Sequence, residues 1–252
     1  MTDAPLVTAE DLGSIRVVRL NRPAQRNALQ YESWTELATV LSDAVTAGVQ
    51  GVVVAGAGGF FSAGGDLKSG PAHGSGPMSP AGRVEHAQQV IEQLKSVPMP
   101  TIAAVEGGAV GLGWSLALSC DLVVAASDAF FSAPFVARAV VPDGGLAWRL
   151  TQQIGRHRAA SLLLRGGRLS AVEAERQGLV TDVVEQGSAV DSAIAIAREL
   201  AGADAGAVEM TKRLMNSAEA AQLAAFNPVE LAIATIAQQR SASGEARGQW
   251  SR

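Results

Sequence analysis

Residues 100–126 read PTIAAVEGGAVGLGWSLALSCDLVVAA, and this stretch decides the fold. Two short, continuously apolar runs, 101–107 and 121–126, have the composition of strands that are covered on both faces of a sheet. Between them, a glycine-rich turn leads into an apolar segment at 111–119 that we expect to be helical. The stretch therefore predicts a strand–helix–strand unit in which a glycine loop precedes the helix.

The same alternation continues on both sides of this unit. After about residue 188 the chain is alanine-rich and is expected to be helical to about 240. We therefore predict an α/β protein with a core at 1–187 and a helical region at 188–252. Further strands are predicted at 14–20, 51–56 and 179–184, and helices at about 30–47, 83–97, 145–154, 157–165 and 171–177.

Composition excludes several classes of protein. The 252 residues are 48% hydrophobic and 17% charged with a net charge of -4, so the chain can bury a large core. It has no run of Lys and Arg and only 4% aromatic residues, so no nucleic-acid partner is predicted. The most apolar stretch, 107–120, is too short to span a bilayer, and the N-terminus lacks a signal-peptide pattern. We therefore expect a cytoplasmic protein without a membrane partner.

Metal and disulfide chemistry are also not indicated. Cys120 is the single cysteine, so no internal disulfide can form, and its apolar neighbours predict a buried thiol. No cluster of His, Asp and Glu has the spacing of metal ligands. No metal site is predicted.

Two loops contain more glycine than a turn requires: GAGGFFSAGGDL (56–67) and EGGAVGLGWSLAL (106–118). A helix N-terminus offers unpaired N–H groups, and glycine lets a ligand approach the backbone closely. Two such loops facing each other could supply two N–H donors to one developing oxyanion. The alternative, that these glycines only permit tight packing, stays open at this point. The spacing matches neither a dinucleotide fingerprint nor a nucleophile elbow.

The stretch VVPDGGLA (140–147) places Asp143 in a bend, because Pro and paired Gly are turn signals. One interpretation is that Asp143 caps the helix that starts near Gly144. The other is that Asp143 is a carboxylate held in a pocket to move a proton. Apolar neighbours such as Phe135 and Val141 would then raise the pKa of Asp143 and make it a stronger base.

Together with NRPAQRNAL (21–29), VPDGG (141–145) and RLSAVEAERQGLVTDVV (168–184), the two glycine loops resemble the crotonase, or enoyl-CoA hydratase/isomerase, superfamily. The resemblance runs in order from about residue 14 to about 215. It implies a spiral of ββα units and a C-terminal helical trimerisation region, with a homotrimer that can pair into a hexamer. It also implies that the substrate is carried as a coenzyme A thioester and that no separate cofactor is needed.

The resemblance also implies roles for single residues. The oxyanion donors would be the backbone N–H groups of Gly65 and Leu112, where Leu112 replaces the glycine of most relatives. Its side chain is then expected to point away from the thioester. Contacts with CoA are implied for Ala24, Arg26, Ala28, Ala63, Asp66 and Leu67, with Arg26 as the partner of a phosphate. Trp250 is a candidate to complete the CoA site from a neighbouring subunit.

The chain departs from the hydratases of this family, which have two glutamates that activate water. Ser115 and Phe135 stand at those positions. Relatives that shift double bonds, especially the 1,2-epoxyphenylacetyl-CoA isomerases of phenylacetate breakdown, resemble this chain in having an aspartate at the position of Asp143. The resemblance thus implies an isomerase with Asp143 as acid and base. The alternatives are a hydratase with Asp143 as sole base and a water held in part by Ser115, and a CoA-ester binding protein with little catalysis.

Several other residues have two interpretations. Phe135, Phe60, Phe61 and Trp114 either line an acyl pocket for aromatic or medium-chain groups or, equally well, pack in the core. Glu106 is expected to be structural. A related dehalogenase branch has a histidine on the helix that contains His86, but Gln88 occupies the matching position. His73 and His157 are expected at the surface.

Overall fold

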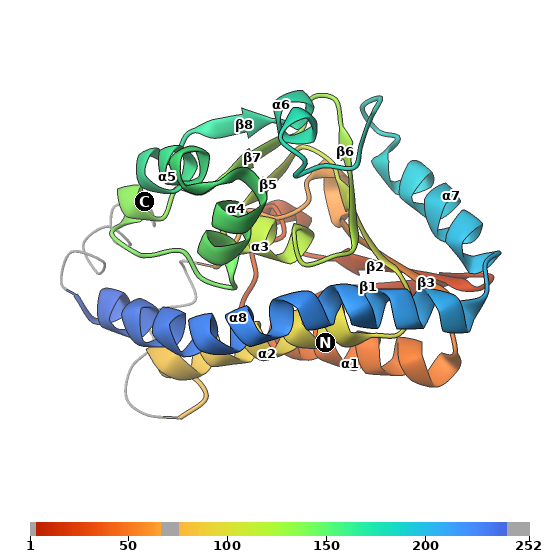
Figure 1. Ribbon diagram of the computed structural model, residues 1–252, viewed down its shortest axis with the longest axis horizontal. Coiled ribbons are helices and arrows are strands. Elements are labelled where there is room, and N and C mark those ends of the chain that lie inside the picture. Colours follow the sequence, from red (N-terminus) through yellow and green to blue (C-terminus); the bar gives the residue numbers. More distant parts are fainter. Residues whose placement is uncertain (1–3, 67–75, 241–252) are drawn as a thin grey trace.

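The structure is a computed structural model that describes residues 4–66 and 76–240. Leu67, His73 and Trp250, which the sequence singled out, lie outside the described residues. A six-stranded sheet with the order β1-β2-β3-β4-β6-β9 forms the centre of the molecule (Figure 1). Strand β1 is antiparallel to β2 and the other neighbours are parallel. The strands are β1 (Val7–Leu12), β2 (Ile15–Leu20), β3 (Gly51–Gly56), β4 (Thr101–Val105), β6 (Leu122–Ala126) and β9 (Asp182–Val184).

A second sheet of three short strands follows the order β5-β7-β8. These strands are β5 (Gly108–Val110), β7 (Phe130–Ser132) and β8 (Arg168–Ser170). Because β4 continues into β5 and then into α3 (Leu112–Ala117), residues 101–117 form one strand–strand–helix unit. This is the ββα unit of the predicted spiral.

The large sheet is covered on both faces. Helix α7 (Ala189–Ala201) packs on one face, where Ile15, Val53 and Ile102 are fully buried against it. On the other face, Val52 and Val54 belong to the core that also includes residues of α1 (Tyr31–Ala47) and α2 (Pro80–Ser96). Every second residue of a strand faces the same side, so a strand covered twice must be apolar throughout. This confirms the strand predicted at 51–56 and explains why it is apolar throughout.

The predicted helices are present near their predicted bounds. The second half of the chain contains α4 (Leu146–Ile154), α5 (Arg156–Arg165), α6 (Ala171–Arg176) and α8 (Ala205–Gln239). Short 3-10 helices are η1 (Pro23–Gln25), η2 (Ala57–Gly59) and η3 (Val136–Arg138). Sequence reasoning missed β1, in which most residues are exposed or half-buried, and the three-residue strands of the second sheet.

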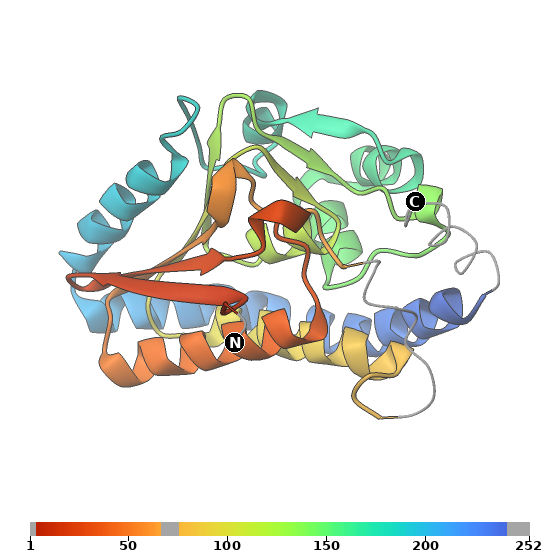
Figure 2. The same cartoon turned by 180° about the vertical axis from the view of Figure 1, so that it is seen from behind.

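Helix α8 runs alongside α2 and spans much of the molecule (Figures 1 and 2). Lys212 anchors it: the buried Nζ lies 2.7 Å from Asp121 Oδ2 and 3.0 Å from the Met99 carbonyl. Among the described residues, α8 alone is long and apolar enough to cross a membrane by length and composition, and 22% of its most apolar stretch is buried. Its buried ionisable side chains, Lys212 and Glu230, are rare in a lipid-facing helix.

Candidate active site

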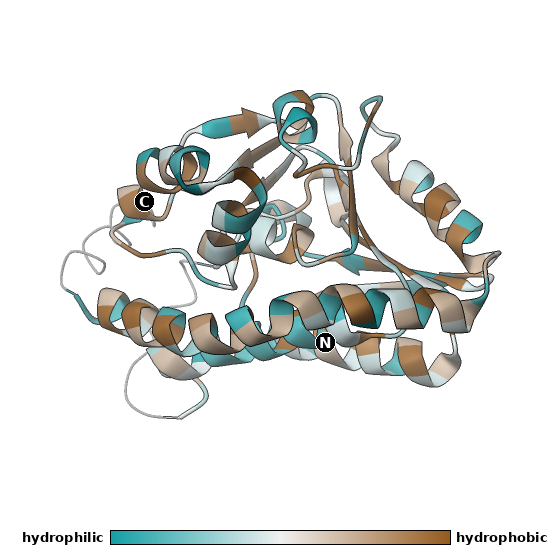
Figure 3. Ribbon diagram, in the orientation of Figure 1, coloured by the Kyte–Doolittle hydropathy of each residue, from teal (hydrophilic) through white to brown (hydrophobic). Residues whose placement is uncertain are grey.

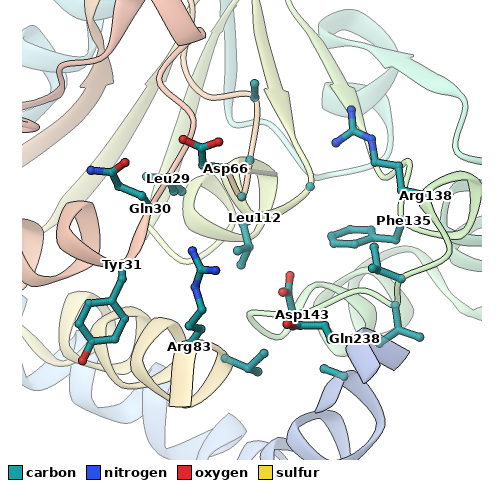
Figure 4. A pocket seen from close by; sticks show the side chains of 18 of the residues that line it. Leu29, Gln30, Tyr31, Asp66, Arg83, Leu112, Phe135, Arg138, Asp143 and Gln238 are labelled. Atoms are coloured by element: carbon teal, nitrogen blue, oxygen red, sulfur yellow. The ribbon is translucent and has the colours of Figure 1, made fainter. Parts of the chain in front are cut away.

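A pocket opens where several segments far apart in sequence meet (Figure 4). The loop after β3, the start of α3, the segment around η3, the start of α2 and the end of α8 all contribute side chains. The structure thus brings together six residues that the sequence analysis selected: Ala63, Gly65, Asp66, Leu112, Phe135 and Asp143.

Three other predicted CoA contacts do not line this pocket. Ala24 and Arg26 are exposed and Ala28 is half-buried. The Arg26 guanidinium lies 5.6 Å from the ring centroid of Phe60, an arrangement that leaves it at the surface. The CoA roles of these residues stay predictions, and Leu67 is outside the described residues.

The two predicted oxyanion donors come from adjacent backbone segments. Leu112 is the first residue of α3, so its N–H has no partner inside the helix. Gly65 forms a parallel bridge with Leu29. Within residues 4–66 and 76–240, neither N–H donates to a protein acceptor. The pocket wall therefore contains two N–H groups that a ligand oxygen could accept from.

Close backbone packing holds the two segments together. Gly64 has a φ of 87°, and a Cβ there would lie 2.5 Å from the Val110 carbonyl oxygen and 3.2 Å from the Leu112 nitrogen. Ser62 strengthens the contact, because its N–H donates to Gly108 O and its carbonyl accepts from Val110 N. Glycine at 64 is thus required for both its dihedral angle and its contact distance.

The side chain of Asn27 holds the loop that follows β3. It is 1% exposed, and its Nδ2 donates to the carbonyls of Ala57 (2.9 Å) and Phe60 (2.6 Å). Its Oδ1 accepts from the Arg22 N–H at 2.9 Å. Arg22 in turn forms an ion pair with Asp66 at 2.7 Å. The NRPAQRNAL motif therefore shapes the loop that carries Gly65, a role that sequence reasoning missed.

Replacing Asn27 with alanine should lower the free energy of unfolding by about 3 kcal/mol, because buried backbone groups lose their partners. Asn21→Ala is the matched control, since Asn21 makes one exposed side-chain hydrogen bond, to Pro5 O, and should cost less than about 1 kcal/mol. Urea unfolding followed by circular dichroism measures both. Equal losses in the two variants would contradict the proposed support of the loop.

Asp143 does not cap a helix. Helix α4 has Gly145 as its N-cap and no side-chain cap, so the capping interpretation is wrong. Gly144 (φ 64°) and Gly145 (φ 77°) turn the chain in the left-handed region, where glycine is favoured. Ser115 Oγ donates to the Asp143 carbonyl at 2.9 Å. The Asp143 carboxyl is left facing the pocket beside Phe135 (Figure 4).

The environment of Asp143 favours its neutral form. Asp143 Oδ1 is buried and accepts no hydrogen bond, although the residue as a whole is half-buried beside the pocket. Burial raises the pKa of Asp143 to about 8, and the negative charge of Glu230 adds to the rise. The direction agrees with the sequence prediction. Glu230 was missed, because a lone glutamate in an alanine-rich helix has no distinguishing pattern.

Ser115 and Phe135, which stand where the resemblance places the two glutamates of the hydratases, are both buried, but of the two only Phe135 lines the pocket. Ser115 is fully buried, does not line the pocket and donates to the carbonyls of Gly111 and Asp143, and its part in holding a water stays a prediction. The Phe135 ring faces the pocket (Figure 4). A carboxylate is therefore missing at both positions.

The other aromatic candidates do not line the pocket. Phe61 and Trp114 are fully buried in the core, and Phe60 packs edge-on against Phe130. The core interpretation is thus correct for Phe61 and Trp114. The Leu112 side chain points along the wall toward the Asp143 turn (Figure 4).

The remaining candidates are structural or peripheral. Glu106 accepts from the N–H groups of Gly187 and Ala189 at the start of α7, which confirms its structural role. His86 stacks on Tyr31 with ring centroids 4.3 Å apart and does not line the pocket. His157 is exposed. No group of three His, Cys, Asp or Glu side chains within the described part of the chain could hold a metal ion.

Comparison with known proteins gives a consistent result. A family model described as enoyl-CoA hydratase/isomerase matches residues 10–247. The chain is 35% identical to 1,2-epoxyphenylacetyl-CoA isomerase of Escherichia coli K12, over 81% of this chain and 79% of that protein. It is also 35% identical to a probable enoyl-CoA hydratase, EchA12, of Mycobacterium tuberculosis H37Rv, over 86% and 79%. The crystal structure of an enoyl-CoA hydratase/isomerase from Mycobacterium paratuberculosis superposes with a TM-score of 0.90, at 26% identity, over 99% of this chain and 100% of that chain.

Proposed function

Because this chain belongs to the enoyl-CoA hydratase/isomerase family, we propose that it is an acyl-CoA isomerase that shifts a double bond with Asp143 as its acid and base. One observation carries the proposal. Among the described residues that line the pocket, the acids are Asp66 and Asp143, and Asp66 is already held by Arg22 at 2.7 Å. Double-bond migration needs one mobile base, whereas hydration also needs a positioned water. A single available carboxylate therefore favours isomerisation.

The proposed reaction begins with the thioester oxygen between the N–H groups of Gly65 and Leu112. These donors stabilise the negative charge of an enolate, which makes the α-proton acidic. The Asp143 carboxylate removes this proton and the electron pair of the C–H bond delocalises onto the oxygen. The protonated Asp143 then returns the proton to the γ-carbon while the double bond moves into conjugation with the thioester. No proton is gained or lost overall.

The acyl group is proposed to be aromatic or medium-chain. Phe135, Val141 and Leu112 give the pocket an apolar wall next to Asp143. The 35% identical relative from Escherichia coli is by its name an isomerase of an aromatic acyl-CoA, which supports this choice.

The test is α-proton exchange in deuterated water, measured by mass spectrometry on 3-enoyl, 2-enoyl and phenylacetyl thioesters of CoA. Deuterium uptake with double-bond migration and without water addition is the expected result. Addition of water to crotonyl-CoA would instead identify a hydratase with Asp143 as sole base. Tight thioester binding without any exchange would identify a CoA-ester binding protein.

We also propose that α8 assembles the chain into a homotrimer or a pair of trimers. The helix exposes apolar side chains along its length, and hydrophobic segments of α8 are visible in Figure 3. Apolar side chains exposed together on one helix commonly mark a protein interface. These side chains are Met210, Leu214, Met215, Val229, Ile233 and Ile236.

Sedimentation equilibrium should therefore give a mass three or six times the 25.8 kDa of one chain. Leu214→Glu should shift the population to the single chain, because Leu214 is 72% exposed and a buried glutamate would disfavour the interface. A monomeric wild-type protein at micromolar concentration would contradict the proposed assembly.

A further inference from the structure

Glu230 is a buried carboxylate whose contacts serve the turn that carries Asp143. It lies on α8 and is 4% exposed. Its Oε1 and Oε2 accept from the Gly145 N–H at 2.9 Å and 3.1 Å. Oε2 also accepts from Gln88 Nε2, on α2, at 2.8 Å. Gly145 is two positions after Asp143, so this contact acts on the turn itself.

The rest of the turn is fixed as tightly. Arg149, on α4 and 3% exposed, donates from Nη1 to the Gly144 carbonyl at 2.8 Å. Ser115 donates to the Asp143 carbonyl from α3. Three successive residues are therefore held from three different helices, and of these three contacts only that of Glu230 brings a negative charge close to the Asp143 carboxyl.

Resting on the proposed acid–base function of Asp143, we propose that Glu230 is a positioning residue that holds the Asp143 turn and sets the pH range over which Asp143 accepts a proton. A neutral acceptor would satisfy the Gly145 N–H equally well. A carboxylate adds like-charge repulsion in a region with little solvent, and this repulsion disfavours ionised Asp143. The two acids then titrate as a coupled pair.

The surrounding charges are consistent with this role. Arg149 is the cation that acts on Glu230, and the charges of Glu92 and Glu219 act on Arg149 in turn. Arg83 from α2 and Arg138 from η3 also line the pocket that Asp143 faces. Burial raises the pKa of Glu230, and its bonds to Gln88 and Gly145 offset only part of this rise. These bonds favour the charged form that acts on Asp143.

The decisive variant is Glu230→Gln, which keeps an oxygen acceptor for Gly145 and removes the charge. Deuterium exchange on the best thioester is measured against pH for the wild type, Glu230→Gln and Glu209→Gln. Glu209 is a partly exposed carboxylate on the same helix and provides a matched change of charge. In Glu230→Gln the acid limb of the kcat profile should move to lower pH by about one unit, with KM nearly unchanged. Glu209→Gln should follow the wild type.

A Glu230→Gln profile that superposes on the wild type would overturn the inference and leave Glu230 a structural residue. Retained exchange in Asp143→Asn would instead overturn the proposed function, so the two failures are distinguishable. If Glu230→Gln does not fold, Gln88→Leu provides the test. It removes a bond that stabilises charged Glu230, so the acid limb should again move to lower pH, and an unmoved limb would overturn the inference.

Discussion

Asp143→Asn should lower the rate of α-proton exchange by about 10³-fold or more, because the amide cannot accept the substrate proton. Binding of the thioester should change little, since the N–H groups of Gly65 and Leu112 are untouched. In the wild type, exchange should fall as the pH drops below about 8, where Asp143 becomes protonated. Mass spectrometry in deuterated buffers from pH 6 to 9 (a range of about three units around this pKa) measures both effects.

The stability of the same variant separates lost chemistry from lost folding. The pKa of Asp143 is raised from 3.8 to about 8 in the folded protein, so the folded state binds more protons than the unfolded state between these values. The contribution of Asp143 to the free energy of unfolding of the wild type therefore declines as the pH rises from 3.8 to about 8. Asparagine does not titrate, so Asp143→Asn should become more stable than the wild type toward pH 8.

An inactive variant that is also less stable at every pH would show that the turn had been disrupted, and exchange that persists in a stable variant would contradict the acid–base role. Thermal unfolding measured at pH 5 and at pH 8, values about three units apart that span most of the expected change in stability, distinguishes a disrupted turn from a lost base. The combination of lost exchange and higher stability at alkaline pH is the expected result.

Gly64→Ala should lower exchange by about 10²-fold by moving the two oxyanion segments apart, since displacements near 1 Å have effects of this size. The new Cβ would lie 2.5 Å from the Val110 carbonyl oxygen and 3.2 Å from the Leu112 nitrogen. The first distance is shorter than the contacts that Cβ atoms make in protein structures. The positive φ of 87° adds backbone strain of about 1–2 kcal/mol. Steady-state kinetics should show the loss mainly in kcat.

Gly59→Ala separates strain from displacement. Gly59 has a φ of 74°, and a Cβ there meets nothing within 4 Å. It should therefore lose about 1–2 kcal/mol of stability and keep its exchange rate. If both variants lost activity equally, the close contact between Gly64 and the start of α3 would not be what aligns the donors.

The sequence predicted the parts of the fold that depend on local pattern. The run at 51–56 is apolar throughout because α7 covers one face of β3 and the main core lies on the other. The loops around Gly65 and Leu112 were selected by their glycines, and both meet at the pocket. Three-residue strands such as β8 are too short to show a period, so their pairing partners determine them.

The contacts that join distant segments could not be predicted. Arg22 and Asp66 are 44 positions apart, and nothing in either neighbourhood indicates the other. In the sequence, the neighbours of Glu230 do not differ from those of a solvated glutamate on a helix. Only the packing of α2 and α4 around its side chain shows that Glu230 is buried. Conversely, Phe61 and Trp114 are aromatic residues of the kind that line acyl pockets, and only their burial in the structure shows that they belong to the core.

The contact between Glu230 and Gly145 spans 85 positions, and this separation has a consequence for the order in which the protein is made. A ribosome that adds about 5–20 residues per second needs roughly 4–17 s to travel from the turn to the helix that holds it. Until α8 has been made, the Gly145 N–H has no Glu230 carboxylate to bond to. The turn that carries Asp143 should therefore reach its final form only late in synthesis.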